Sequence, residues 1–153
     1  MKKTLTPFVI GALVLIFGGT ALAGATTTTS HFSTFTDVIP VSCAGAFTGA
    51  TVINASGNGI SHLTVNDTGS WLTLTFEGQG TITVTPPGAT YQGHVQEWFG
   101  DENNKQNGVE HATFNFNGTN VLTSASFGMH AAFDVTTNAN GSTTVSNFTV
   151  DCR

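Results

Sequence analysis

Basic residues are scarce in this sequence of 153 residues, which has four Lys and Arg against nine Asp and Glu. Lys2 and Lys3 lie at the start of the chain, which leaves only Lys105 and Arg153 for the rest. Binding to nucleic acids needs clustered Lys and Arg to neutralise phosphates, and binding to anionic membrane surfaces needs the same clusters. The sequence therefore predicts no nucleic-acid partner.

Long apolar runs are also lacking, apart from the one between Phe8 and Phe17. That run is short for a bilayer core of about 30 Å. It follows Lys2 and Lys3 and precedes Ala21-Leu22-Ala23, which is the order of a secretory signal peptide. We expect residues 1–23 to be removed and the mature chain to be secreted, with no integral membrane segment.

Cysteine is limited to Cys43 and Cys152. An exported compartment lets such a pair oxidise, so we predict one disulfide that closes nearly the whole domain and contributes about 4 to 5 kcal/mol at best. The alternatives are two free thiols or half of a metal site. No cluster of Cys and His has the spacing of a zinc site, and His94 and Glu97 would point to opposite faces of a strand. We predict no metal and no cofactor.

The chain is rich instead in short alternating segments separated by turn-forming residues. Charged residues make up only 8% of the chain, which nevertheless contains 12 Phe. Turn signals occur at 54–59, 66–69, 77–80, 86–88, 117–118 and 138–141. The segments between them predict strands at 31–39, 46–53, 60–66, 70–77, 80–85, 91–99, 110–116, 122–135 and 142–150. Residues 24–30 read as a flexible spacer, and 31–153 as a single all-β domain.

Eight or nine strands joined mostly by tight hairpins favour an antiparallel up-and-down meander. We expect it to close as a small β-barrel, with a β-sandwich as the alternative. A bond between Cys43 and Cys152 favours the barrel, because it would bring the first and last strands together.

A long hairpin between Tyr91 and Phe116 carries the candidate site. If Phe99 faces Glu110 across it, Glu97 and Glu110 become diagonal carboxylates on an apolar inward face. One of them would then take a raised pKa and could act as a general acid or base, with Tyr91 as a polar anchor. Alternatively, both glutamates only solvate the rim. The predicted apolar ligand-binding residues on this face are Phe99, Phe114, Phe127 and Met129.

The opposite face of the hairpin would carry Trp98 and His111 side by side. An exposed indole beside histidines is typical of a recognition patch for a sugar or another partner. The alternative interpretation is a cross-strand pair that stabilises the sheet by less than about 1 kcal/mol.

The segments Tyr91-x-Gly93 and Trp98-Phe99-Gly100, with the Asn-rich loop and the Thr-Phe-Asn-Phe strand that follow, resemble a family of small exported bacterial proteins of uncharacterised function. The resemblance covers most of the mature chain. It implies export and an all-β fold, and it transfers no catalytic residue.

We therefore expect an exported, non-enzymatic β-barrel that binds a small apolar ligand or a surface partner, through the Phe-lined interior or the Trp98/His111 face. One alternative is a small barrel enzyme of cyclase, isomerase or lyase type, which would use Glu97, Glu110 and Tyr91. Another is a structural, surface-associated protein. The oligomeric state stays open.

Overall fold

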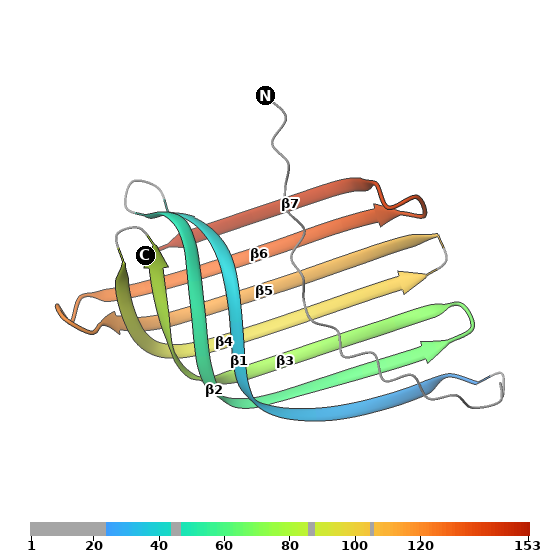
Figure 1. Ribbon diagram of the computed structural model, residues 1–153, viewed down its shortest axis with the longest axis horizontal. Helices are drawn as coiled ribbons and strands as arrows, with labels where there is room; N and C mark the ends of the chain where they lie inside the picture. The colour runs from blue at the N-terminus through green and yellow to red at the C-terminus, as the bar shows by residue number, and fades with distance from the viewer. Residues whose placement is uncertain (1–23, 44–46, 86–87, 105) are drawn as a thin grey trace.

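The computed structural model describes residues 24–43, 47–85, 88–104 and 106–153 (Figure 1). The predicted signal peptide lies outside these residues. The described chain forms seven strands: β1 (Thr26–Cys43), β2 (Phe47–Asn66), β3 (Gly69–Thr85), β4 (Ala89–Asn104), β5 (Asn107–Asn120), β6 (Ser126–Asn138) and β7 (Thr143–Cys152). No described segment is a helix that could cross a membrane.

Each strand pairs antiparallel with the next one in the chain, so the sheet order is β1-β2-β3-β4-β5-β6-β7. This confirms the all-β class and the up-and-down meander. The turn between β2 and β3 shows how the sequence specifies one of these connections. The Asn66 Oδ1 atom accepts hydrogen bonds from the backbone N–H groups of Thr68, at 2.8 Å, and Gly69, at 3.1 Å. An Asn side chain commonly closes a tight turn in this way.

The described strands number seven and are longer than the predicted eight or nine. Three predicted turns, at 54–59, 77–80 and 117–118, lie inside β2, β3 and β5. The segment between the predicted strands at 91–99 and 110–116 is also mostly strand, because the β4–β5 ladder continues to the pair formed by Asn103 and Gly108. The last five residues of the predicted spacer also belong to a strand, since Thr26–Ser30 pair with residues 61–65 of β2.

Glycines inside the long strands allow neighbouring strands to approach closely. Gly57 faces Gly78 across β2 and β3, and Gly93 faces Gly118 across β4 and β5. A Cβ atom at Gly93 would lie 2.1 Å from the carbonyl oxygen of Asn117, which no side chain tolerates. All four glycines alternate in register with the core residues of their strands, so they face inward. Figure 1 shows β2, β3 and β4 turning sharply part-way along their length. Glycine is the residue that permits such a bend in a continuous strand.

The bend brings inward-facing side chains from the two arms of the sheet into one core. Ile53, Ile82 and Val84 come from one arm, Val95 and Phe116 come from the other, and all five are fully buried. Aromatic contacts add to this packing, with the Phe35 and Phe76 ring centroids 5.2 Å apart. A contiguous core of this kind provides most of the stability of a small all-β domain.

The sheet is not closed. The hydrogen-bonded order begins at β1 and ends at β7, and β1 only approaches β7 without a ladder between them. The Cys152 thiol is not free, and this side chain packs against the core. The side chain of Cys43 lies outside the described residues, so the predicted bond between the two cysteines stays a prediction.

Candidate functional site

The turn of the β4–β5 hairpin is shorter than predicted and lies further along the chain than Phe99. Its turn follows Asn104, whose Oδ1 atom accepts hydrogen bonds from the backbone N–H groups of Gln106 and Asn107, both at 2.8 Å. The register therefore differs from the predicted one by two residues: Phe99 faces Ala112, and Glu110 faces Asp101. A shift of two residues keeps every side chain on its predicted face but changes its neighbours.

This shift separates the two glutamates. Glu97 faces Phe114, and the Phe99–Ala112 pair lies between Glu97 and the Asp101–Glu110 pair. Glu97 and Glu110 are therefore not the diagonal neighbours that the sequence predicts. Each of them instead has an aspartate as its acidic neighbour.

Glu97 is the most perturbed acid among the described residues. Burial, and secondarily the negative charge of Asp37, raise its pKa to about 8. Its Oε2 atom is buried and has no hydrogen-bond partner among the described residues. Burial also raises the pKa of Asp37, although a hydrogen bond of 2.7 Å from the backbone N–H of Val38 opposes that rise. Glu97 is therefore a buried carboxyl group with a raised pKa, and its charged neighbour comes from β1 rather than from the hairpin.

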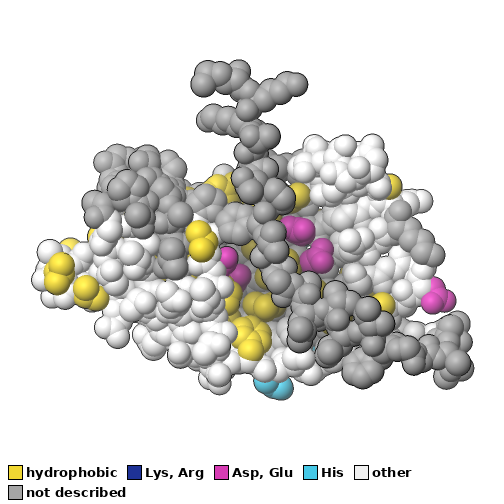
Figure 2. Space-filling view, in the orientation of Figure 1, with side chains coloured by type: hydrophobic (Ala, Val, Ile, Leu, Met, Phe, Trp, Pro, Cys, Tyr) yellow, Lys and Arg dark blue, Asp and Glu magenta, His cyan; other side chains and the backbone are white. Residues whose placement is uncertain are grey.

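A second pair of carboxyl groups lies toward the tip of the hairpin. Burial raises the pKa of Asp101, while burial and the charge of Asp101 together raise the pKa of Glu110. Both side chains line a polar pocket of about 360 Å³ together with Asn103, Asn104 and Asn138. Acidic side chains gather in the hollow of the face shown in Figure 2. Among the described residues, no three Asp, Glu, His or Cys side chains are grouped closely enough to hold a metal ion.

The remaining inward candidates belong to the packed core. Phe114, Phe127 and Met129 are almost fully buried. Tyr91 is buried too, and its ring stacks on Phe127 with the centroids 4.6 Å apart. Phe99 is half-buried. A ligand could contact most of these side chains only by displacing their present neighbours. Tyr91 and Glu97 also lie on opposite sides of the bend at Gly93 in β4.

The outer face presents Trp98, whose side chain is 41% exposed. Trp98 faces Thr75 on β3 and Thr113 on β5. His111 lies one outward position further along β5 and is not directly opposite Trp98, because it faces Gly100. The His111 Nδ1 atom contacts the Asp134 carboxylate of β6. Trp98 and His111 are thus diagonal neighbours on the predicted face, with an unpredicted acid beside them.

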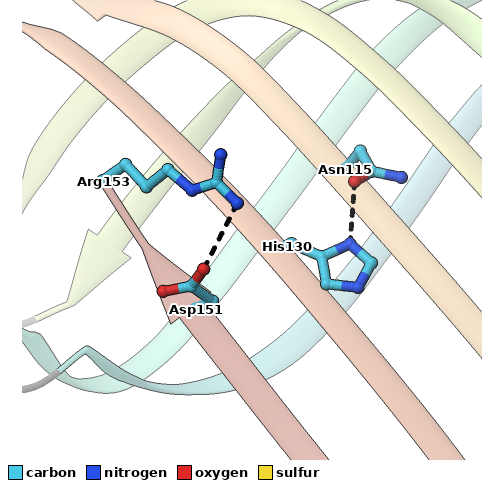
Figure 3. A network of polar contacts seen from close by, with 4 residues as sticks. All are labelled: Asn115, His130, Asp151 and Arg153. Carbon is cyan, nitrogen blue, oxygen red and sulfur yellow. Dashed lines mark hydrogen bonds and ion pairs between the residues drawn. The ribbon is translucent and has the colours of Figure 1, made fainter.

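Polar side chains continue across the outer face of β5, β6 and β7. The ring nitrogen Nδ1 of His130 donates a hydrogen bond of 2.8 Å to Asn115 Oδ1 (Figure 3). Arg153 and Asp151 form an ion pair of 3.4 Å nearby. His130 therefore has a cross-strand partner that strand alternation alone did not identify.

Asp37 was the most informative residue that the sequence interpretation missed. It lies between Phe35 and Ile39 in strand alternation, and all three face inward. That spacing was a usable signal, because an acid in the apolar phase of a strand is buried by its neighbours. Asp134 gave no comparable signal, since its contact with His111 depends on the β5–β6 register.

Comparison with protein-family models, with curated proteins and with solved structures finds no match for this chain. The resemblance to small exported bacterial proteins therefore stays a prediction.

Proposed function

We propose that this chain is an exported, non-enzymatic β protein that binds a surface partner through its outer face. The observation that supports the proposal best is the exposed indole of Trp98, beside the His111–Asp134 contact. Large exposed aromatic side chains with adjacent polar groups are typical of recognition surfaces, because they provide contact area at little cost in conformational entropy.

The inward face gives less support to the other functions considered. Its Phe side chains fill the core, so binding of a small apolar ligand would require them to separate. An enzyme of cyclase, isomerase or lyase type would need its acid, base and anchor at one point. Glu97, Glu110 and Tyr91 are instead spread along the hairpin and separated by other core residues.

Export and a covalent bond between Cys43 and Cys152 belong to the same proposal. Cys152 is not a free thiol, and Cys43 is the only other cysteine in the sequence. The approach of β1 to β7 is compatible with this bond. We propose that this bond, rather than a strand ladder, links the two outer strands of the open sheet.

The proposal is tested by binding to washed cells of the organism that encodes the chain. We expect the mature protein to be retained by the cells and the Trp98→Ala variant to be lost in the wash. Phe148→Ala is the matched control, because Phe148 is 43% exposed on β7 at an inward-facing position away from Trp98. Equal retention of wild type and Trp98→Ala would refute binding through this face.

A further inference from the structure

A shallow groove of about 370 Å³ lies beside Trp98 on the outer face of β2, β3 and β4. Asn58, Glu77 and Gln96 form one outward row across these three strands, and all of them line the groove. Thr75 lines it from the next row and is the cross-strand partner of Trp98. The groove and the indole therefore form one continuous surface, the Trp98 patch.

The absence of a side chain at Gly100 lets the indole of Trp98 lie close to the sheet. The position that a Cβ atom of Gly100 would take lies 2.9, 3.2 and 3.6 Å from three atoms of the six-membered ring of Trp98. The ring therefore covers Gly100, and its other side faces solvent. An aromatic ring laid along a sheet is a platform on which a flat molecule can stack with little reorganisation.

Hydrogen-bonding groups border this platform on both sides. On one side, His94 Nε2 lies 3.1 Å from Glu77 Oε1, and Glu77 remains largely exposed. On the other side, His111 contacts Asp134, which is about half exposed. These contacts orient the carboxylates and leave acceptor positions free for the hydroxyl groups of a ligand.

The charge of the surface argues against an acidic partner. Within the described residues the only Lys or Arg is Arg153, and it pairs with Asp151 away from the Trp98 patch. The patch also lacks the apolar centre of a stable protein–protein interface, because only Ile60 adds a partly exposed apolar side chain to the groove. Its Thr, Asn and Gln side chains suit a ligand with many hydroxyl groups.

We infer that the Trp98 patch binds a neutral polysaccharide chain. One sugar ring stacks its C–H face on the Trp98 indole, and the hydroxyl groups of the adjacent ring bind Gln96, Glu77 and Asn58 in the groove. This inference rests on the proposed function and names the chemical class of the surface partner.

The test uses the mature protein and washed cells that have been treated in two ways. Periodate oxidation cleaves the vicinal diols of sugars, whereas protease treatment removes surface proteins. We expect periodate to reduce retention of the wild-type protein to the level of Trp98→Ala. Retention that survives periodate would overturn the inference, and its loss on protease treatment alone would identify a protein partner and leave the proposed function intact. Equal retention of wild type and Trp98→Ala on untreated cells would overturn both.

Two further variants separate loss of stacking from loss of folding. Trp98→Phe keeps an aromatic ring, and we expect it to bind more tightly than Trp98→Ala, which should be weakened by about tenfold. Gly100→Ala leaves Trp98 in place but pushes the indole off its seat, because the new Cβ meets only the end of that side chain. We expect it to weaken retention and shift the Trp fluorescence with little change in melting temperature. Wild-type retention by a folded Gly100→Ala protein with a shifted fluorescence spectrum would contradict the stacking geometry.

Discussion

The Glu97→Gln substitution should stabilise the protein increasingly as the pH rises. In the folded protein Glu97 has a pKa of about 8, against an ordinary value of 4.5. Folding therefore favours the protonated form, and the unfolded chain releases this proton more readily. Between pH 4.5 and pH 8 the ionisation of Glu97 therefore lowers the free energy of unfolding of the wild type by about 1.4 kcal/mol per pH unit. Below pH 4.5 the group is protonated in both states and its contribution no longer changes.

The expected magnitude follows from the same shift. From pH 4.5 to 7 the wild type should lose about 3 kcal/mol relative to a variant without this titration, and the loss should reach about 5 kcal/mol above pH 8. Glutamine has nearly the same shape as glutamate and stays neutral. It therefore removes the titration without opening a cavity next to Phe76 or Phe114.

Urea unfolding at pH 5, 6, 7 and 8 measures this difference. Glu102→Gln is the matched control, because it makes the same chemical change on the exposed outer face of the same strand. The stability of Glu97→Gln relative to wild type should rise with pH, whereas that of Glu102→Gln should stay nearly constant. Parallel pH profiles for wild type and Glu97→Gln would refute the argument that Glu97 is buried and uncompensated.

Two further predictions concern the bend and the cysteines. Gly93→Ala should destabilise the fold by about 3 kcal/mol or prevent folding, because the new Cβ would overlap the Asn117 carbonyl oxygen. Gly108→Ala is the control and should be tolerated, because its Cβ would have no described neighbour closer than 3.9 Å. Equal melting temperatures of the two variants in thermal unfolding would contradict the close approach of β4 and β5 at Gly93. Non-reducing peptide mapping should recover Cys43 and Cys152 in one linked peptide pair. Reduction should lower the free energy of unfolding by about 4 to 5 kcal/mol at most. Two free thiols in the secreted protein would refute the bond.

The sequence predicted the fold class and the faces of the strands better than their lengths. Alternation identified the inward phase of β4 and β5 correctly, since it depends only on whether a side chain is next to the core. Gly57 and Gly78 misled the strand count. A glycine that ends a strand in a turn and a glycine that lets a strand bend have the same local sequence. What distinguishes the two cases is the residue on the neighbouring strand, such as Gly78 opposite Gly57, and the local sequence around a glycine does not specify that residue.

In the candidate site, too, the face of a residue was easier to predict than its neighbours. Glu97 was identified as an acid on an apolar face, and its burial and raised pKa follow from that placement. Its supposed partner was wrong because the hairpin turn occurs at Asn104, several residues beyond the expected loop opening. Its actual charged neighbour, Asp37, comes from a strand distant in sequence. Such contacts depend on how the sheet folds over itself at its glycines.

The odd number of strands has a consequence for the two edges of the sheet. In an antiparallel meander of seven strands, β1 and β7 run in the same direction, so closure would require the only parallel ladder in the described fold. Their final residues, Cys43 and Cys152, therefore end at the same side of the sheet. A bond there would fasten one corner while the edge backbone groups elsewhere along β1 and β7 stayed unpaired. Those two edges are then places where an added strand, from another copy of the chain or from a peptide, could extend the sheet.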